Sequence, residues 1–427
     1  MTDRGRLGMA LALLAACVAL GAHLFAGEAA QRALAAASPA APAAPSAAPS
    51  PSAAPPAGPA LSAQAQLGQL AFHDVSLSAS GRQSCATCHD AASGHVAPND
   101  LAVQLGGVDL DRPGSRSAQP IRYLRTNGAF GFDAEGKARG GFFWDGRAAS
   151  LEEQAKGPFT NPVEMANINA AEVVARLSRS GYAAQFERLH GAAIWQDPER
   201  AFDRLAAAIA AFEREDPAFA PFTSRYDDVL RGKARLTPAE QRGLALFKDP
   251  AKGNCAACHT ADKGPDGSLP LFTDFSYDNL GVPRNPALAH NRDAAYFDLG
   301  LCARAAGDLA SRRELCGAFK VPSLRNVAER KRFFHNGSFT SLREVLRFYV
   351  QRDTHPERWY SRRADGSIAK FDDLPPHLHG NVNTAEGPYD RKPGDQPALD
   401  DAEIEDVLAF LATLSDRLDR PAQAAAR

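Results

Sequence analysis

Apolar residues recur three or four positions apart in several parts of the chain, and this spacing predicts amphipathic helices. Asp400 precedes the most regular of these stretches and Glu403 follows three residues later, so this helix should begin with a capping box. Long regions around 260–320 and 361–399 lack any such period. The pattern therefore predicts a mostly α-helical fold with extensive loops. The predicted helices are 171–179, 198–213, 341–350 and 400–414.

Residues 1–30 have a different pattern from the rest of the chain. Arg4 and Arg6 precede an apolar run from Leu7 to Ala26, which is typical of an export signal. The run is about twenty residues long, enough to span a membrane. A cleaved signal peptide and an uncleaved N-terminal membrane anchor therefore both stay open. Lipoprotein cleavage at Cys17 is less favoured, because the apolar sequence continues beyond it.

Residues 31–60 consist almost entirely of Ala, Pro and Ser. Such a segment cannot bury a core, so it is expected to be a disordered linker without chemistry of its own. The whole chain of 427 residues is long enough for two or three domains. Its formal net charge of -2 gives no reason to expect nucleic acid as a partner.

Two short motifs carry the chemistry of the chain. Residues 85–89 and 255–259 both read Cys-x-x-Cys-His, the attachment signature of a c-type haem. On one helical turn the two thiols can form thioethers with one porphyrin, and the histidine is then held as an iron ligand. A redox dithiol or half of a zinc site is the alternative, but two intact copies favour two covalently bound haems c. The predicted haem residues are Cys85, Cys88, His89, Cys255, Cys258 and His259.

The segments that lead into the two motifs also resemble each other. The second lead-in opens with Thr237-Pro238-Ala239-Glu240, a capping box with proline at the first helical position. An internal repeat predicts two cytochrome c-like helical domains, 61–232 and 233–420, each with one haem. The repeated spacing joins Gly68, Phe72 and Asp74 in the first copy and Gly243, Phe247 and Asp249 in the second.

Cys302 and Cys316 lie outside the haem motifs, and we expect them to form a disulfide rather than two free buried thiols. Haem c is attached outside the cytoplasm, where oxidised cysteine pairs persist. Closing this short loop would contribute about 3 kcal/mol on the chain-entropy model. The same reasoning, with the export signal, predicts a periplasmic protein.

Three further segments carry a resemblance to a known family. The stretch 144–147 reads Trp-Asp-Gly-Arg and is followed by Gln154, Pro158 and Glu164, 321–327 reads Val-Pro-Ser-Leu-Arg-Asn-Val, and 335–337 reads His-Asn-Gly. With the paired haem motifs, the chain from about 61 to 415 resembles the bacterial di-haem cytochrome c peroxidase/MauG family. The resemblance implies that the N-terminal haem reacts with peroxide and the C-terminal haem passes or stores electrons. It also implies that a calcium ion commonly lies between them.

The resemblance also implies roles for individual residues. Trp144 matches a tryptophan between the two haems, a relay for electrons, although an ordinary buried aromatic residue is the alternative. Gln154 and Glu164 match the pair above the peroxide-reacting haem. A carboxylate there can move a proton between the two peroxide oxygens. The alternative for this pair is a solvated helix face.

The chain departs from the peroxidases proper at both irons. Residues 97–122 contain no histidine, and His95 is not favoured as a ligand. We therefore expect an open distal site at the first haem without prior reduction. At the second haem no methionine follows His259, and Tyr349 matches the ligand position instead, as in MauG-like members. A phenolate ligand should lower the reduction potential relative to a thioether.

Alternatives remain for the second haem and for calcium. Tyr349 could be a core residue of its helix, and His335 and His355 are the next candidate ligands. Family members often have asparagine near 117 and Thr-x-Pro near 330–332, where this chain has Ser117, Arg330 and Arg332. Calcium would then depend on backbone carbonyls and waters.

Three functions fit these features. The first is a periplasmic peroxidase that reduces hydrogen peroxide at the His89 haem, with electrons from a small cytochrome c or copper protein passing through the His259 haem. The second is a MauG-like enzyme that uses peroxide and high-valent iron to oxidise residues of a partner protein. The third is a di-haem electron carrier without catalysis, which the Gln154/Glu164 pair argues against.

Overall fold

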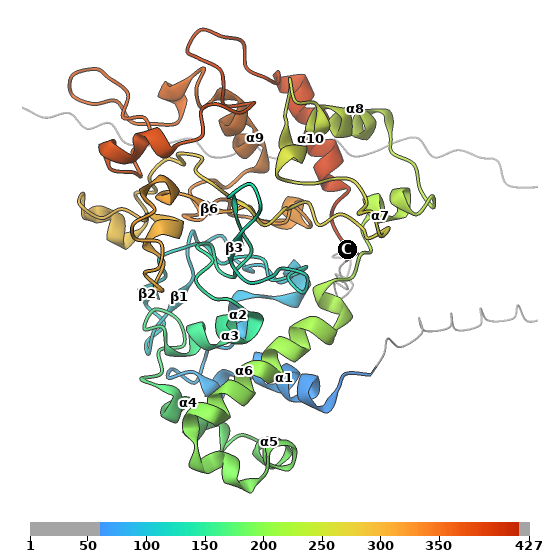
Figure 1. Ribbon diagram of the computed structural model, residues 1–427, viewed down its shortest axis with the longest axis vertical. Coiled ribbons are helices and arrows are strands. Elements are labelled where there is room, and N and C mark those ends of the chain that lie inside the picture. The colour runs from blue at the N-terminus through green and yellow to red at the C-terminus, as the bar shows by residue number, and fades with distance from the viewer. Residues whose placement is uncertain (1–59, 418–427) are drawn as a thin grey trace, which may run out of the picture. The chain divides into compact units, whose positions relative to one another are not determined.

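The computed structural model describes residues 60–417. The predicted export signal or anchor, most of the predicted linker and Cys17 lie outside the described residues. As predicted, the described chain is helix-rich with little sheet, and much of it forms loops and turns (Figure 1). None of its helices combines the length and the apolar character needed to cross a membrane.

The helices and strands are short. The α-helices are α1 (Ala63–His73), α2 (Cys85–Cys88), α3 (Leu151–Thr160), α4 (Ala170–Leu177), α5 (Ala183–His190), α6 (Pro198–Glu215), α7 (Arg225–Leu230), α8 (Pro238–Lys248), α9 (Leu342–Gln351) and α10 (Asp401–Ala412). Three antiparallel pairs join β1 (Leu105–Gly106) to β2 (Arg112–Pro113), β3 (Gly131–Phe132) to β4 (Ala138–Arg139), and β5 (Tyr277–Asp278) to β6 (Phe319–Lys320).

Capping residues fix where the predicted helices begin. Asp400 and Glu403 form the predicted capping box of α10, and Thr237 and Glu240 form that of α8. Ser341 is the N-cap of α9 rather than its first residue. The four predicted helices are all present, with ends that differ by one or two residues, as expected from fraying at helix termini.

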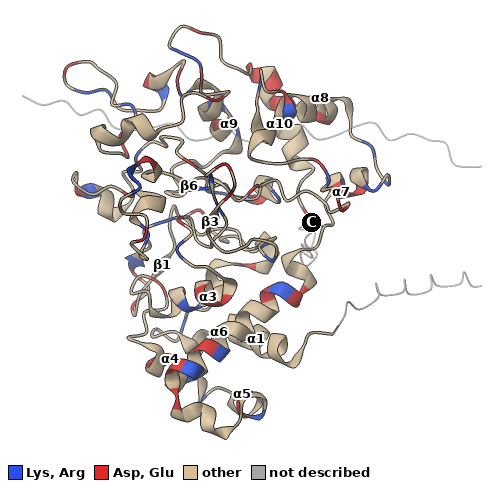
Figure 2. Cartoon of the chain, in the orientation of Figure 1, with Lys and Arg blue, Asp and Glu red and all other residues tan. Residues whose placement is uncertain are grey.

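Two large hydrophobic cores, accompanied by smaller apolar clusters, lie within the described chain. One is built mainly from α1, α3, α4 and α6, and contains Phe72 and Phe159. The other is built mainly from α8, α9 and α10, and contains Phe247 and Phe410. Acidic and basic residues are interspersed on the surface of helices such as α4 and α6 (Figure 2), in keeping with the small net charge.

The repeated glycines explain how each core is assembled. Gly68 is the sixth residue of α1, and Gly243 is the sixth residue of α8. A Cβ atom on Gly68 would lie 1.9 Å from the carbonyl oxygen of Ala208 on α6, and one on Gly243 would lie 1.9 Å from that of Asp406 on α10. Glycine therefore allows α1 to cross α6, and α8 to cross α10, at backbone contact (Figure 1). The predicted repeat is present in the packing of these helices.

A second repeat becomes evident in the structure. Residues 142–151 and 333–342 share the pattern Phe-Phe-x-(Asp or Asn)-Gly-x-x-x-Ser-Leu. In both copies the second phenylalanine has a φ of 64°, and a short antiparallel bridge closes the turn. The serine of each copy is the N-cap of a ten-residue helix, α3 in the first case and α9 in the second. Pro158 of α3 and Tyr349 of α9 are both the eighth residue of their helix.

Cys302 and Cys316 form a disulfide, which confirms that expectation. Both residues are 5% exposed and pack with Leu378 in a small apolar cluster. The bridge closes a loop in the long region that lacks helical periodicity.

Candidate functional site

The first Cys-x-x-Cys-His motif lines a cavity. Cys85 and Cys88 are the ends of α2, a single helical turn, and His89 follows directly. Burial lowers the pKa of His89 to about 4, so its ring is neutral at neutral pH. The carbonyl groups of His95 and Gln119 partly offset this shift, although neither accepts a well-formed hydrogen bond from Nδ1. A neutral imidazole is the form that binds iron.

Gln154 and Glu164 line the same cavity as His89. Gln154 is on α3, and Glu164 lies in the turn that follows this helix. The Nδ2 of Asn161 donates a 2.8 Å hydrogen bond to Oε1 of Glu164, and Oε2 has no hydrogen-bond donor among the described residues. Burial raises the pKa of Glu164, while Arg147 and the hydrogen bond from Asn161 oppose the shift. This carboxyl group is thus suited to hold or release a proton.

The other side chains of this cavity include few that could bind iron. Neither a second histidine nor a tyrosine lines it among the described residues, but Met165 does. His95, which the sequence did not favour, is buried elsewhere, where its Nδ1 accepts a 3.1 Å hydrogen bond from Nε of Arg122. Its ring stacks on Phe219 with 4.3 Å between ring centres. Met165 is therefore a candidate ligand that the sequence analysis passed over, although it directly follows Glu164.

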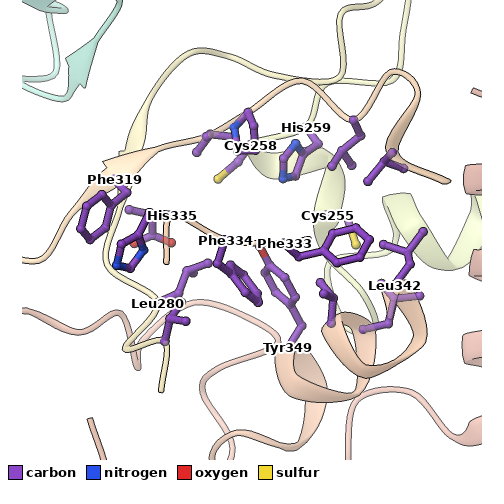
Figure 3. Close-up of a pocket in the computed structure, with 18 of the residues that line it drawn as sticks. Cys255, Cys258, His259, Leu280, Phe319, Phe333, Phe334, His335, Leu342 and Tyr349 are labelled. Carbon is purple, nitrogen blue, oxygen red and sulfur yellow. The ribbon is translucent and has the colours of Figure 1, made fainter. Parts of the chain in front are cut away.

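The second motif lines a second cavity, shown in Figure 3. Cys255 begins a single 3₁₀ turn, and Cys258 and His259 follow it. The Nδ1 of His259 lies 2.8 Å from the carbonyl oxygen of Phe272, to which it must donate a hydrogen bond. In a neutral ring the other nitrogen, Nε2, is then unprotonated. Burial lowers the pKa of His259 to about 4, so this ring is also neutral.

Tyr349 enters the second cavity from α9. Figure 3 shows His259 and Tyr349 extending toward one another across the cavity, with Phe333 and Phe334 beside them. The Tyr349 ring lies 6.0 Å from that of Phe334 and 5.9 Å from that of Tyr389, centre to centre. Burial raises the pKa of Tyr349. In this surrounding the phenol is protonated unless a positive charge such as ferric iron compensates the phenolate.

The two alternative histidines have other contacts. His335 lines the second cavity, but its ring stacks on Phe319 with 3.5 Å between ring centres and 7° between ring planes. His355 does not line the cavity, and its Nδ1 lies 2.9 Å from the Thr354 hydroxyl oxygen. Tyr349 is thus the candidate that extends toward His259 across the cavity, whereas the His335 ring is stacked on Phe319 and His355 does not line the cavity.

Trp144 borders both cavities. It is 8% exposed, and its indole Nε1 donates a 2.8 Å hydrogen bond to the carbonyl oxygen of Ser117. The structure thus brings the predicted residues of both motifs to either side of this tryptophan. The wall that the cavities share consists of Ser117, Ala118, Pro120, Trp144, Lys320, Val321 and Pro322.

An ion-pair network around the buried carboxylate of Asp145 holds the Trp144 turn. Arg116 bonds to Asp145 and to Asp298, each at 2.7 Å, and Arg147 bonds to Asp145 at 2.9 Å. Burial acts to raise the pKa of Asp145, but the two arginines hold it below its ordinary value. Neither Arg116 nor Asp298 is predicted from the sequence, because no local pattern relates residues so far apart.

The donor set of each cavity fits a covalently bound haem. Each has two cysteines one turn apart and a neutral histidine, and the buried Nδ1 of His89 has no hydrogen-bond partner among the described residues. Burial raises the pKa of Cys85 to about 12 and that of Cys88 to about 11, so neither is a thiolate that would act as a redox nucleophile. No group of three or more His, Cys, Asp or Glu residues in the described chain is placed to hold a metal ion by itself.

Comparisons with known proteins agree with this donor set. A family model described as di-haem cytochrome c peroxidase matches residues 62–235. The chain is 39% identical over 373 residues to the methylamine utilization protein MauG of Paracoccus denitrificans, covering 85% of this chain and 91% of that protein. It is 31% identical to the cytochrome c551 peroxidase of Nitrosomonas europaea, covering 67% and 73% of the two chains.

A solved structure is similar over most of the chain. The diheme peroxidase BthA of Burkholderia thailandensis has 40% sequence identity and a TM-score of 0.76, and the match covers 83% of this chain and 86% of that one. A MauG-like protein associated with microbial copper homeostasis has 27% identity and a TM-score of 0.58.

Proposed function

The chain belongs to the di-haem cytochrome c peroxidase family that includes MauG, and we propose that it reduces hydrogen peroxide at the His89 haem with electrons that arrive through the His259 haem. Members of this family are oxidoreductases with two haems c. The domain limits 61–232 and 233–420 are consistent with this division of labour, because each domain contains one haem motif and most of one of the two largest hydrophobic cores.

One observation carries the proposal. The two cavities that contain the haem motifs share a wall, and Trp144 is part of it. An aromatic side chain in the shared wall gives electrons a route from one haem cavity to the other that does not pass through solvent. A protein with two independent haems would have no need for this arrangement.

The side chains of the first cavity are suited to peroxide. When bound, the haem iron supplies the redox chemistry with peroxide. Glu164 would accept a proton from one peroxide oxygen at Oε2 and return it to the other, which assists O–O cleavage. Asn161 holds this carboxyl group through Oε1, and the Gln154 amide would orient the bound peroxide by a hydrogen bond. Trp144 would carry electrons.

The second repeat supports an open site at the first haem. Pro158 has the place in α3 that Tyr349 has in α9. Proline has no side-chain atom that can bind iron, whereas tyrosine offers its phenolic oxygen. We therefore assign Tyr349 as the second ligand of the His259 haem and leave the corresponding position of the His89 haem for peroxide.

A second function is favoured by a specific observation. No methionine lines the second cavity among the described residues, and Tyr349 extends into it. A phenolate ligand stabilises oxidised iron, which suits a MauG-like enzyme that uses peroxide to oxidise residues of a partner protein. Oxidation of a partner protein without an added electron donor would favour this function over peroxide reduction with a cytochrome c or copper-protein donor.

Location, calcium and the carrier function complete the proposal. The N-terminal pattern and the haem c motifs support a periplasmic location. Calcium would need backbone carbonyls and waters, and Ser117 already uses its carbonyl oxygen to accept a hydrogen bond from Trp144.

A plain electron carrier would need a second protein ligand at both irons, and Met165 is the candidate for that ligand at the first iron.

The test is the low-temperature EPR spectrum of the oxidised protein, with Tyr349→Phe and Met165→Leu as variants. We expect one high-spin and one low-spin ferric haem, with the low-spin signal changed only by Tyr349→Phe. Two low-spin haems, one of them altered by Met165→Leu, would contradict the open site. In that case the protein would be an electron carrier or a peroxidase that needs reductive activation.

A further inference from the structure

The wall between the two cavities contains one titratable side chain, that of Lys320. The other six residues that line both cavities are Ser117, Ala118, Pro120, Trp144, Val321 and Pro322, none of which changes charge near neutral pH. Lys320 ends β6, and it is only 6% exposed. It is therefore a buried amine that faces both cavities.

The contacts of Lys320 do not neutralise its charge. Its Nζ donates a hydrogen bond to the carbonyl oxygen of Gly141, and it lies 5.6 Å from the centre of the Phe142 ring and 5.9 Å from that of Tyr277. Its backbone N–H donates a 2.9 Å hydrogen bond to the carbonyl oxygen of Trp144. These neutral partners position the amine beside the tryptophan turn.

No carboxylate of the described residues forms an ion pair with Lys320. Asp145 is the acid that acts on it, but Asp145 already bonds to Arg116 and Arg147. Burial lowers the pKa of Lys320 to about 7, and Asp145 only partly opposes this shift. A buried ammonium without a counter-charge is costly, so the charged form calls for an anion in the cavities.

The cofactor that fits these cavities brings such anions, because each haem carries two propionate carboxylates. We propose that Lys320 is the cation shared by propionate groups of both haems, and that it raises the reduction potentials of the two irons together. This inference rests on the proposed function only in requiring both haems. It deepens that function, because one side chain would set the driving force on both sides of Trp144.

The direction of the effect follows from charge. Each iron gains one electron on reduction, and a nearby positive charge stabilises the form that carries the extra electron. The negative charge of a propionate has the opposite effect, because it destabilises the reduced form of the iron. An ammonium that neutralises the propionate removes this destabilisation. Replacing Lys320 with a neutral residue should therefore lower both reduction potentials, whereas arginine, which keeps the charge, should not.

The experiment is a spectroelectrochemical titration, with redox mediators, of the haem-loaded wild-type protein and its variants. We expect Lys320→Met to shift the ferric/ferrous equilibrium of both haems at least tenfold toward ferric, which is 59 mV for a one-electron couple. Lys320→Gln keeps a donor for the Gly141 carbonyl and should give the same shift if the methionine variant folds poorly. Lys320→Arg should stay close to wild type.

Two controls separate this effect from a general loss of charge. Lys156 pairs with Asp203 and lines neither cavity, so Lys156→Met should leave both potentials unchanged. Arg330 lines only the second cavity and donates to the carbonyl oxygen of Ser323, so Arg330→Met should move the His259 haem alone.

Unchanged potentials in both neutral variants would overturn the proposal, as would a shift confined to one haem or an equal shift in Lys156→Met. The peroxidase assignment is judged separately, by peroxide consumption in the wild-type protein. A red protein that consumes peroxide but shows no effect of Lys320 would refute only the role of the lysine. A red protein that does not consume peroxide would refute only the catalytic function.

Discussion

At the scale of single residues, burial gives two carboxyl groups of the first cavity unusual protonation behaviour. Glu164 has a raised pKa, and its Oε2 receives no hydrogen bond from the described residues. Glu213 of α6 is 8% exposed and lines the same cavity, and burial raises its pKa to about 8. Arg214 lowers this value and Glu152 raises it, but burial dominates. Glu164 is suited to proton transfer, whereas ionisation of the buried Glu213 destabilises the folded state.

Glu164→Gln should slow peroxide turnover by roughly 10²- to 10⁴-fold, the usual range for loss of a general acid–base group. The amide keeps the shape of the side chain but cannot accept and return a proton. Stopped-flow measurement of the reaction with peroxide would test this, with Glu199→Gln on exposed surface of α6 as the control. Equal rates in wild type and Glu164→Gln would remove Glu164 from the mechanism.

Glu213 should make folding stability depend on pH. The folded protein holds its proton up to a pKa of about 8, whereas the unfolded chain loses it near the ordinary value of 4.5. Stability should therefore fall as pH rises from 4.5 to 8, by on the order of a few kcal/mol for this group. In Glu213→Gln this contribution should vanish. Denaturant unfolding of the haem-loaded protein at pH 5 and pH 8.5 would measure it, and identical pH slopes would contradict the prediction.

At the scale of helices, glycine decides how closely the repeated pairs cross. The same position of α1 and α8 lies against a carbonyl oxygen of α6 or α10. Phe72 and Phe247, four residues further on, are each 1% exposed. This spacing explains why the two lead-in segments look alike: both place a glycine at a backbone crossing and a phenylalanine in a core. The pattern serves packing and not chemistry.

Gly68→Ala and Gly243→Ala should each destabilise the protein by about 1–3 kcal/mol, because the added methyl group forces the crossing helices apart. Gly181 is the matched control, since a Cβ atom there would meet no atom within 4 Å. Urea unfolding midpoints of the three variants would test this. A midpoint for Gly68→Ala or Gly243→Ala that equals the control would show that the crossings can relax without cost.

At the scale of the described chain, the shared wall depends on contacts between distant residues. Arg116 joins Asp145 of the tryptophan turn to Asp298, with side chains 18%, 6% and 11% exposed. Arg325 pairs with Asp227, and both side chains are almost fully buried. The Arg116–Asp298 and Arg325–Asp227 pairs each join a residue of the proposed domain 61–232 to one of the proposed domain 233–420.

Arg116→Met should destabilise the protein by about 3–5 kcal/mol, because it leaves Asp298 buried without its partner and weakens the contacts of Asp145. The double variant Arg116→Met/Asp298→Leu should recover part of this loss, since no uncompensated charge then remains at position 298. Thermal unfolding of both variants would measure the difference. A double variant no more stable than the single one would contradict this account.

The sequence by itself determined the features that depend on short spacing. Both Cys-x-x-Cys-His motifs, the capping boxes of α8 and α10 and the lead-in repeat each lie within a few turns of chain, so local geometry fixes them. The disulfide could be favoured from chemistry alone, because only Cys302 and Cys316 remained outside the motifs and the N-terminal segment. The repeat of residues 142–151 in 333–342 was also visible in the sequence, but it went unnoticed.

Only the tertiary structure decided which residues face the cavities. It placed Lys320 in the wall beside Trp144, put Met165 in the first cavity, packed His95 against Phe219 and joined Arg116 to Asp298. A residue's burial and partners depend on segments that approach from far along the chain. The local sequence carries no signal of such an approach. The surroundings of Lys320, Met165 and His95 could therefore not be predicted from the residues next to them in the chain.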